Sequence, residues 1–309
     1  CRLSRWPVRL VCLGLILGPV GFARAGAPYA GTVVLAPDII TSGDPSALQT
    51  STPSGSGQRQ MFDRRVADWL VLKAWLFTAS YSDGNPVEIQ VNPEFTFAEA
   101  TEKAEFYAYA IGQLPAVMRT DVQTVWIHKG NEAFGGGNNN ILIHTDSPGY
   151  HGQWLEETLF HEAGHTSIDS RLYNTSAWNN ARASDPEFIS TYARDNPGRE
   201  DVAESVLLYY AVRFRRDRIS AETLATIEPA MPARLGVFDT LNIRPVLNNS
   251  SLSPVIGVRN VSVNRRNTSA WFAFGMTPLI RPAFSASANI SDSNNIMGEI
   301  NPDPAYLGQ

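Results

Sequence analysis

Two histidines four residues apart, His161 and His165, have the acidic residue Glu162 directly after the first of them. On an α-helix, residues four apart lie above one another on one face, so both imidazoles can bind a single metal ion. Glu162 is rotated by about 100° from His161, close enough to take a proton from a metal-bound water without binding the metal itself. Roughly 0.004 such H-E-x-x-H patterns are expected by chance in a chain of this length. The alternative interpretation is an ordinary amphipathic helix that carries two histidines.

The residue types around this pattern favour zinc held by histidine and carboxylate ligands. Both cysteines, Cys1 and Cys12, lie in a leader that is expected to be removed, so the mature chain offers no thiolate. A catalytic zinc of this kind usually has three protein ligands and one position for water. A third histidine at the metzincin spacing is excluded, because Ile168 and Arg171 occupy the positions where that pattern needs Gly and His.

Two acidic residues further along the chain, Glu200 and Glu204, are the candidates for the third ligand. They lie four apart at the start of an expected helix, after Pro197, and therefore share one face. The simpler alternative is that they only complement the positive end of that helix. Asp201 and Asp169 are the next candidates if neither glutamate binds. The remaining histidines are interpreted as strand or loop residues: His128, His144 and His151.

The order of these motifs resembles the gluzincin metallopeptidases, in which a glutamate on a second helix completes a zinc site. The segment HEAGHTSID at 161–169, followed by TYAR at 191–194 and EDVAE at 200–204, resembles more locally the catalytic domains of the anthrax lethal factor type. The resemblance covers about residues 156–205, with one additional residue between Tyr192 and Glu200. It implies the zinc ligands His161, His165 and Glu200, the general base Glu162, the phenol Tyr192, and two supporting acids, Glu204 and Asp169.

These roles predict peptide-bond hydrolysis, in which Glu162 assists the attack of a water that zinc activates. Tyr192 is expected to donate a hydrogen bond to the developing oxyanion. The alternative interpretation is that Tyr192 is a half-buried aromatic residue in a loop. Glu204 is expected to accept the N–H of a ligating imidazole. Asp169 is expected to cap or brace the end of its helix.

Helices and strands must hold these residues together. Helices are predicted over 153–168 and 198–216, and a third over 97–113 that closes before a Leu-Pro pair. Alternating or apolar runs predict strands at 87–91, 124–128 and 141–145. We expect the last to be a sheet edge that pairs with an extended peptide. The result is an α+β, zincin-like domain with a small mixed or antiparallel sheet.

Three glycines and three asparagines in a row, at 135–140, predict a turn with positive φ between two of the strands. One interpretation is a surface hairpin loop, and the other is a flexible segment beside a substrate cleft.

The chain is divided by composition into four parts. Residues 1–25 have the basic, apolar and A-x-A order of a secretory signal peptide, and an apolar run of about 13 residues is too short to span a bilayer. Residues 26–60 are expected to be a low-complexity linker, because 42–60 are rich in Ser, Thr, Pro and Gly. The catalytic domain is expected at 61–235, and 236–309 form a C-terminal extension without an assigned role.

The net charge of −5 at pH 7 does not suit a polyanionic partner, so nucleic-acid binding is not expected. A stable membrane anchor is not expected after signal cleavage either. The sequence predicts a secreted or periplasmic zinc metallopeptidase that acts on peptides or proteins. The alternatives are an exported zinc-binding or structural protein with little turnover, and a zinc hydrolase of a non-peptide amide.

Overall fold

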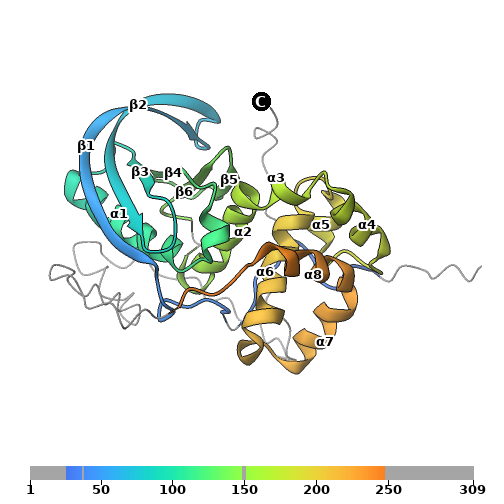
Figure 1. The fold of residues 1–309 in the computed structure, drawn as a ribbon. Coiled ribbons are helices and arrows are strands. Elements are labelled where there is room, and N and C mark those ends of the chain that lie inside the picture. The colour runs from blue at the N-terminus through green and yellow to red at the C-terminus, as the bar shows by residue number, and fades with distance from the viewer. Residues whose placement is uncertain (1–25, 37, 148–150, 248–309) are drawn as a thin grey trace, which may run out of the picture.

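The computed structural model describes residues 26–36, 38–147 and 151–247, and in these it shows a mixed α+β fold with one six-stranded sheet (Figure 1). The strands are β1 Leu48–Asp63, β2 Asp68–Tyr81, β3 Val87–Val91, β4 Thr124–His128, β5 Gly135–Gly137 and β6 Asn140–His144. The α-helices are α1 Phe97–Gly112, α2 Leu155–Ser167, α3 Asp169–Leu172, α4 Ser176–Ser184, α5 Thr191–Asp195, α6 Asp201–Phe214, α7 Ala221–Ala230 and α8 Pro232–Phe238. Short 3₁₀ helices lie at Ala116–Arg119, Gly152–Trp154, Arg216–Arg218 and Asp239–Leu241. The helices and strands predicted around the motifs are therefore confirmed.

The sheet is mixed and has the order β1-β2-β3-β4-β6-β5. Strands β1, β2 and β3 are antiparallel, β3, β4 and β6 are parallel, and β5 is antiparallel to β6. The expectation that 141–145 forms the sheet edge is wrong, because β6 lies between β4 and β5. The edge beside the helices is β5.

The Gly- and Asn-rich segment does not form a hairpin between β4 and β6, which are parallel. Its turn joins β5 to β6 instead, and Asn138 and Asn139 have the positive φ values of 50° and 57°. The glycines before them form β5 itself. Asparagine tolerates the left-handed region better than most residues, so the turn falls on the asparagines.

The two faces of the sheet are covered differently. The apolar side chains of Val125, Ile127 and Ile143 belong to the main core together with α1, α2 and α6. On the opposite face Trp126 packs with Met61, at the far end of β1, in a smaller core. The long β1–β2 hairpin thus bends back over the sheet, as its curvature in Figure 1 shows.

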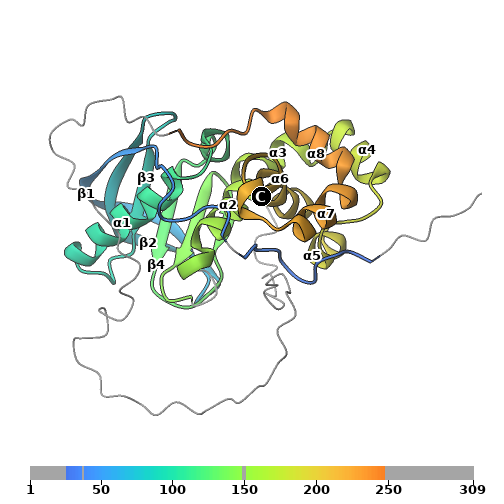
Figure 2. The same ribbon diagram turned by 90° about the horizontal axis from the view of Figure 1, so that it is seen from below.

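Helix α2 lies between the sheet and a group of helices formed by α4 to α8 (Figures 1 and 2). It contacts β5 on one side and α6 on the other. Helix α6 is buried from Asp201 to Val212. The buried Arg234 of α8 binds Asp201 at the start of α6 and also Asp185, which follows α4. These contacts hold the beginning of α6 in position.

The expectation of a low-complexity linker at 26–60 is wrong for most of that segment. Residues 48–60 pair with β2 through backbone hydrogen bonds, which do not depend on apolar side chains. Before them, Val33, Leu35 and Ile39 are buried in the main core. The buried Glu157 of α2 accepts the backbone N–H groups of Leu35 at 2.7 Å and Ile39 at 2.9 Å. This N-terminal segment is part of the folded body.

The boundary expected at 235 also falls inside the body. Helix α8 continues to Phe238, and Ile243 is fully buried. The predicted signal peptide at 1–25 and most of the predicted extension, 248–309, lie outside the described residues. Of the helices that are described, none combines the length and apolarity that a membrane span requires.

Candidate metal centre

Helix α2 brings both histidines of the H-E-x-x-H pattern to one face. The Nε2 atoms of His161 and His165 are 3.1 Å apart, and the rings meet edge to face with centroids 4.8 Å apart. The helix is buried on nearly all sides, with Leu155, Leu159 and Ala163 in the core. His165 keeps 15% of its side chain exposed, so the histidine face is the one that opens to solvent.

Glu200 completes a three-residue cluster from the start of α6. Its Oε2 atom is 3.5 Å from His161 Nε2 and 3.2 Å from His165 Nε2. Glu200 occupies the N-cap position of α6, but its side chain makes no capping hydrogen bond. Complementing the helix end is therefore not what orients this carboxylate. In the described part of the chain, these residues are the one group of His, Cys, Asp or Glu with metal-binding spacing, with ligand atoms within 4.8 Å of one another.

The spacing of the three donor atoms suits a tetrahedral zinc ion. Zinc lies about 2.0–2.1 Å from imidazole nitrogens and carboxylate oxygens, which places tetrahedral ligand atoms about 3.3 Å from each other. The three separations here are 3.1, 3.2 and 3.5 Å. Two imidazoles and one carboxylate are also a donor set found in catalytic zinc sites. These residues can hold zinc without rearrangement.

Acceptors behind the imidazoles fix their orientation. Asp169, at the start of α3, accepts a hydrogen bond from Nδ1 of His165 at 2.8 Å, which directs Nε2 towards the cluster. Glu204 Oε1 lies 3.6 Å from Nδ1 of His161. The other oxygen of Glu204 accepts the backbone N–H of Val33 at 3.1 Å. Asp169 therefore contacts a candidate ligand directly, in addition to its expected position at the helix end.

The electrostatics of the cluster favour a positive charge at its centre. Burial raises the pKa of Glu200, but the two histidines outweigh it and hold that pKa well below the usual range. Burial lowers the pKa of His165, yet Asp169 and Glu200 raise it well above its ordinary value. Burial raises the pKa of Glu204 to about 7, against the opposing effect of His161. The carboxylate of Glu200 and the imidazole of His165 thus stabilise each other's charged forms.

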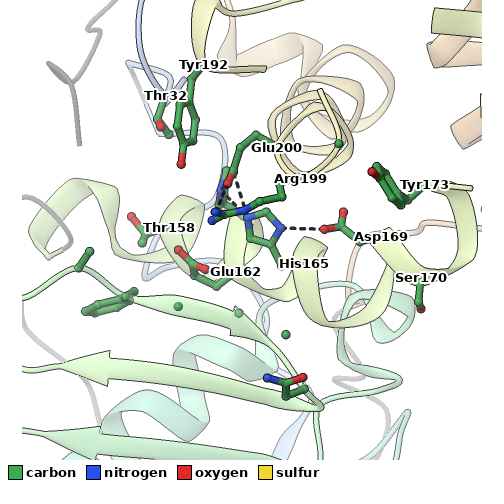
Figure 3. A pocket seen from close by; sticks show the side chains of 18 of the residues that line it. Thr32, Thr158, Glu162, His165, Asp169, Ser170, Tyr173, Tyr192, Arg199 and Glu200 are labelled. Carbon is green, nitrogen blue, oxygen red and sulfur yellow. Dashed lines mark hydrogen bonds and ion pairs between the residues drawn. The ribbon is translucent and has the colours of Figure 1, made fainter. Parts of the chain in front are cut away.

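Glu162 and Tyr192 lie beside the cluster without belonging to it, and Figure 3 shows both near Glu200. Both line the same cavity as the cluster. Tyr192 lies on α5, and Glu200 is near enough to influence the pKa of its hydroxyl. Burial and the negative charge of Glu200 raise the pKa of Tyr192, so its hydroxyl keeps its proton.

The N-terminal segment positions α5 and hence Tyr192. The backbone carbonyl of Tyr29 accepts the N–H of Thr191 at 2.8 Å, and Gly31 N–H donates to the Thr191 hydroxyl at 2.8 Å. Ser190 caps α5 by accepting the N–H of Ala193. A segment expected to be a linker therefore orients a candidate catalytic residue.

The cavity has a volume of about 340 Å³. One wall is β5, where Gly136 lies so close to α2 that a Cβ atom would meet the Glu162 carbonyl oxygen at 2.0 Å. Sequence reasoning missed several lining residues: Thr32, Val33, Val34, Arg64, Tyr173 and Arg199. No catalytic motif marks them, and loops and turns bring most of them to the cavity. The Gly-rich segment does line it, as one of its two interpretations expected.

Comparison with protein-family models, curated proteins and solved structures found no match.

The other histidines lie elsewhere, as expected. His128 and His144 stack with centroids 5.5 Å apart, buried on the sheet face that the β1–β2 hairpin covers. His151 contacts the hydroxyl of Tyr107 at 2.7 Å. None of them joins the cluster. Asp201, a reserve candidate for the third ligand, is bound to Arg234 instead.

Proposed function

We propose that this chain is an exported zinc metallopeptidase of the gluzincin type, with zinc bound by His161, His165 and Glu200. One observation carries the proposal. Three donor atoms lie at tetrahedral zinc spacing in a cavity that also contains the carboxylate of Glu162. The leader at 1–25 supports export, and the mixed sheet with its two ligand-bearing helices agrees with a zincin-like arrangement.

Zinc, when bound, would polarise the scissile carbonyl and lower the pKa of a water molecule towards neutrality. Glu162 accepts the proton of the attacking water and returns it to the leaving amine. Tyr192 donates its hydroxyl hydrogen bond to the carbonyl oxygen as negative charge develops there. Asp169 and Glu204 hold the imidazoles in orientation.

The substrate backbone is proposed to lie along β5. This strand pairs with β6 on one side and lines the cavity through Gly135 and Gly136. An extended peptide can add to such an edge by main-chain hydrogen bonds. Glycines keep this wall free of side chains, so the peptide backbone can come close to Glu162.

The test is proteolysis of an unfolded protein mixture by the zinc-loaded wild type and by the Glu162→Gln variant. We expect Glu162→Gln to keep stoichiometric zinc and to lose most hydrolysis, because the residue moves a proton and binds no metal. Glu105→Gln, an exposed change on α1, is the matched control and should leave both properties unchanged. A wild type that binds zinc and cleaves nothing would refute the proposal, and loss of zinc in Glu162→Gln would refute the role of that residue.

A further inference from the structure

Arg199 lies at the metal cluster and faces the cavity. It directly precedes Glu200, lines the same cavity and keeps 37% of its side chain exposed. Its Nη2 atom is 3.3 Å from Oε1 of Glu200, whereas Oε2 of that carboxylate faces the two imidazoles. Figure 3 shows Arg199 beside Glu200 and His165. A permanent positive charge therefore lies next to the proposed reaction centre.

In the part of the chain that the structure describes, one side-chain contact of the Arg199 guanidinium is seen. Within the described residues, Glu200 Oε1 is the ionic partner of Arg199. A guanidinium carries five N–H donors in a planar fork, and one contact uses a single nitrogen. The fork matches a carboxylate, which it binds through two parallel hydrogen bonds. Arg199 can thus keep its contact with Glu200 and also bind a second carboxylate that enters the cavity.

A second arginine brings positive charge to the β5 wall. Arg64, in the turn after β1, lines the cavity, and its Nη2 atom lies 2.9 Å from where a Cβ on Gly135 would be. The absence of a side chain at Gly135 makes room for this guanidinium. Arg64 lies in the turn after β1 and Arg199 in the turn before α6, so their convergence is a result of the tertiary fold.

The cavity is close to neutral in charge. Its lining has two arginines and three carboxylates, 2 − 3 = −1, and a divalent cation changes this to +1. Of the carboxylates, Asp169 and Glu200 already face imidazoles. The whole chain, in contrast, carries −5. The two arginines bring the cavity closer to neutral than the chain as a whole, and bound zinc would make it positive.

We infer that Arg199 makes this site selective for peptides that carry a carboxylate next to the scissile bond. The inference rests on the proposed metallopeptidase function and specifies its substrate class. The carboxylate has two sources: the C-terminus of the peptide, or an Asp or Glu side chain that flanks the cleaved bond. Arg199 is a specificity-determining residue in either case, because it borders the ligand Glu200.

The experiment compares peptides that differ only in charge: Asp against Asn and Glu against Gln beside the cleaved bond, and free against amidated C-termini. We expect kcat/KM of the wild type to favour the carboxylate form about 10–100-fold, the usual range for a hydrogen bond to a charged group. Arg199→Gln should reduce this ratio to about 1, and Arg199→Lys should keep part of it. Arg194→Gln, an exposed arginine paired with Asp195, is the control and should keep the full ratio. Amidation that removes the preference identifies the C-terminus as the source, and Asp→Asn exchange that removes it identifies the side chain.

Two measurements separate failure of the inference from failure of the proposed function. Zinc content is measured for each variant, so that loss of metal is recognised. Equilibrium binding of the same peptides to Glu162→Gln gives the charge preference without turnover. Equal binding of acidic and amide peptides, or an unchanged preference in Arg199→Gln, would overturn the inference. Cleavage of both peptide forms at equal rates would overturn it while leaving the metallopeptidase function intact.

Discussion

Glu200 and Glu204 lie one helical turn apart, yet they approach opposite nitrogens of His161. Glu200 is 3.5 Å from Nε2, on the cluster side, and Glu204 is 3.6 Å from Nδ1, behind the ring. Glu204 also binds the backbone of Val33 and is almost fully buried. A shared helix face therefore does not imply a shared role, because the imidazole lies between the two carboxylates.

This difference predicts the order of two zinc titrations. Glu200→Ala removes a donor atom and should abolish zinc binding at concentrations where Glu204→Ala remains loaded. Glu204→Ala removes a group that orients His161, so its metal affinity or activity should fall about 10–100-fold. Competition with a chromophoric chelator measures both affinities. The reverse order would make Glu204 the ligand, and equal small losses would place the third ligand elsewhere.

At the scale of elements, the contact between β5 and α2 sets the width of the cavity. The short strand is made only of glycines, and one of them, Gly136, lies directly on the backbone of Glu162. A side chain here would separate the strand from the helix that carries the histidines. The glycines allow β5 and α2 to approach each other closely, in addition to the conformational freedom that they give the backbone.

We expect Gly136→Ala to destabilise the protein by about 1–3 kcal/mol, the usual cost of an overpacked contact. Activity should fall further than stability, because the strand and the catalytic glutamate move apart. Denaturant unfolding and peptide hydrolysis measure the two effects. The control is Gly236→Ala on α8, where an added Cβ meets nothing within 4 Å and should be neutral or stabilise by up to about 1 kcal/mol. A fully stable, active Gly136→Ala would contradict this account of the wall.

At the scale of the whole molecule, buried ionisable groups connect distant parts of the chain. His128 lies between the sheet and the end of the β1–β2 hairpin, where it accepts a hydrogen bond from Asn92 and lies 3.6 Å from Asp63. Burial lowers its pKa to about 4, and the nearby Asp63 only partly opposes this. Arg64, which lines the cavity, follows Asp63 directly. The buried pair of His128 and Asp63 is therefore next in sequence to a residue of the site.

The lowered pKa of His128 predicts acid destabilisation. The unfolded chain binds a proton at this histidine below about pH 6.5, whereas the folded chain binds it only below about 4. The contribution to stability is therefore complete above pH 6.5 and is lost as the pH falls from 6.5 to 4, by up to about 1.4 kcal/mol per pH unit. His128→Gln should show a smaller slope when unfolding free energy is measured across this range. An unchanged slope would assign the effect to other groups.

The sequence by itself determined the parts that depend on local periodicity. The helix of 155–167, with His161 and His165 on one face, follows from the 3.6-residue repeat, and the strands at 87–91 and 124–128 follow from their apolar patterns. Glu200 was reachable through a resemblance, and its position beside both imidazoles agrees with it. The helix and the strands need only neighbours in the chain.

Tertiary structure decided which segments meet, because strand pairing and cavity walls depend on contacts between residues far apart in sequence. The Ser- and Gly-rich stretch at 48–60 became a strand through backbone pairing with β2, whatever its side chains. Residues 135–137 became the edge strand, in which Gly136 lies where a side chain would collide with the backbone of α2. Arg64 and Arg199 reached one cavity from separate turns. No local sequence pattern encodes these long-range contacts, because the free energy that stabilises them comes from packing of the complete chain.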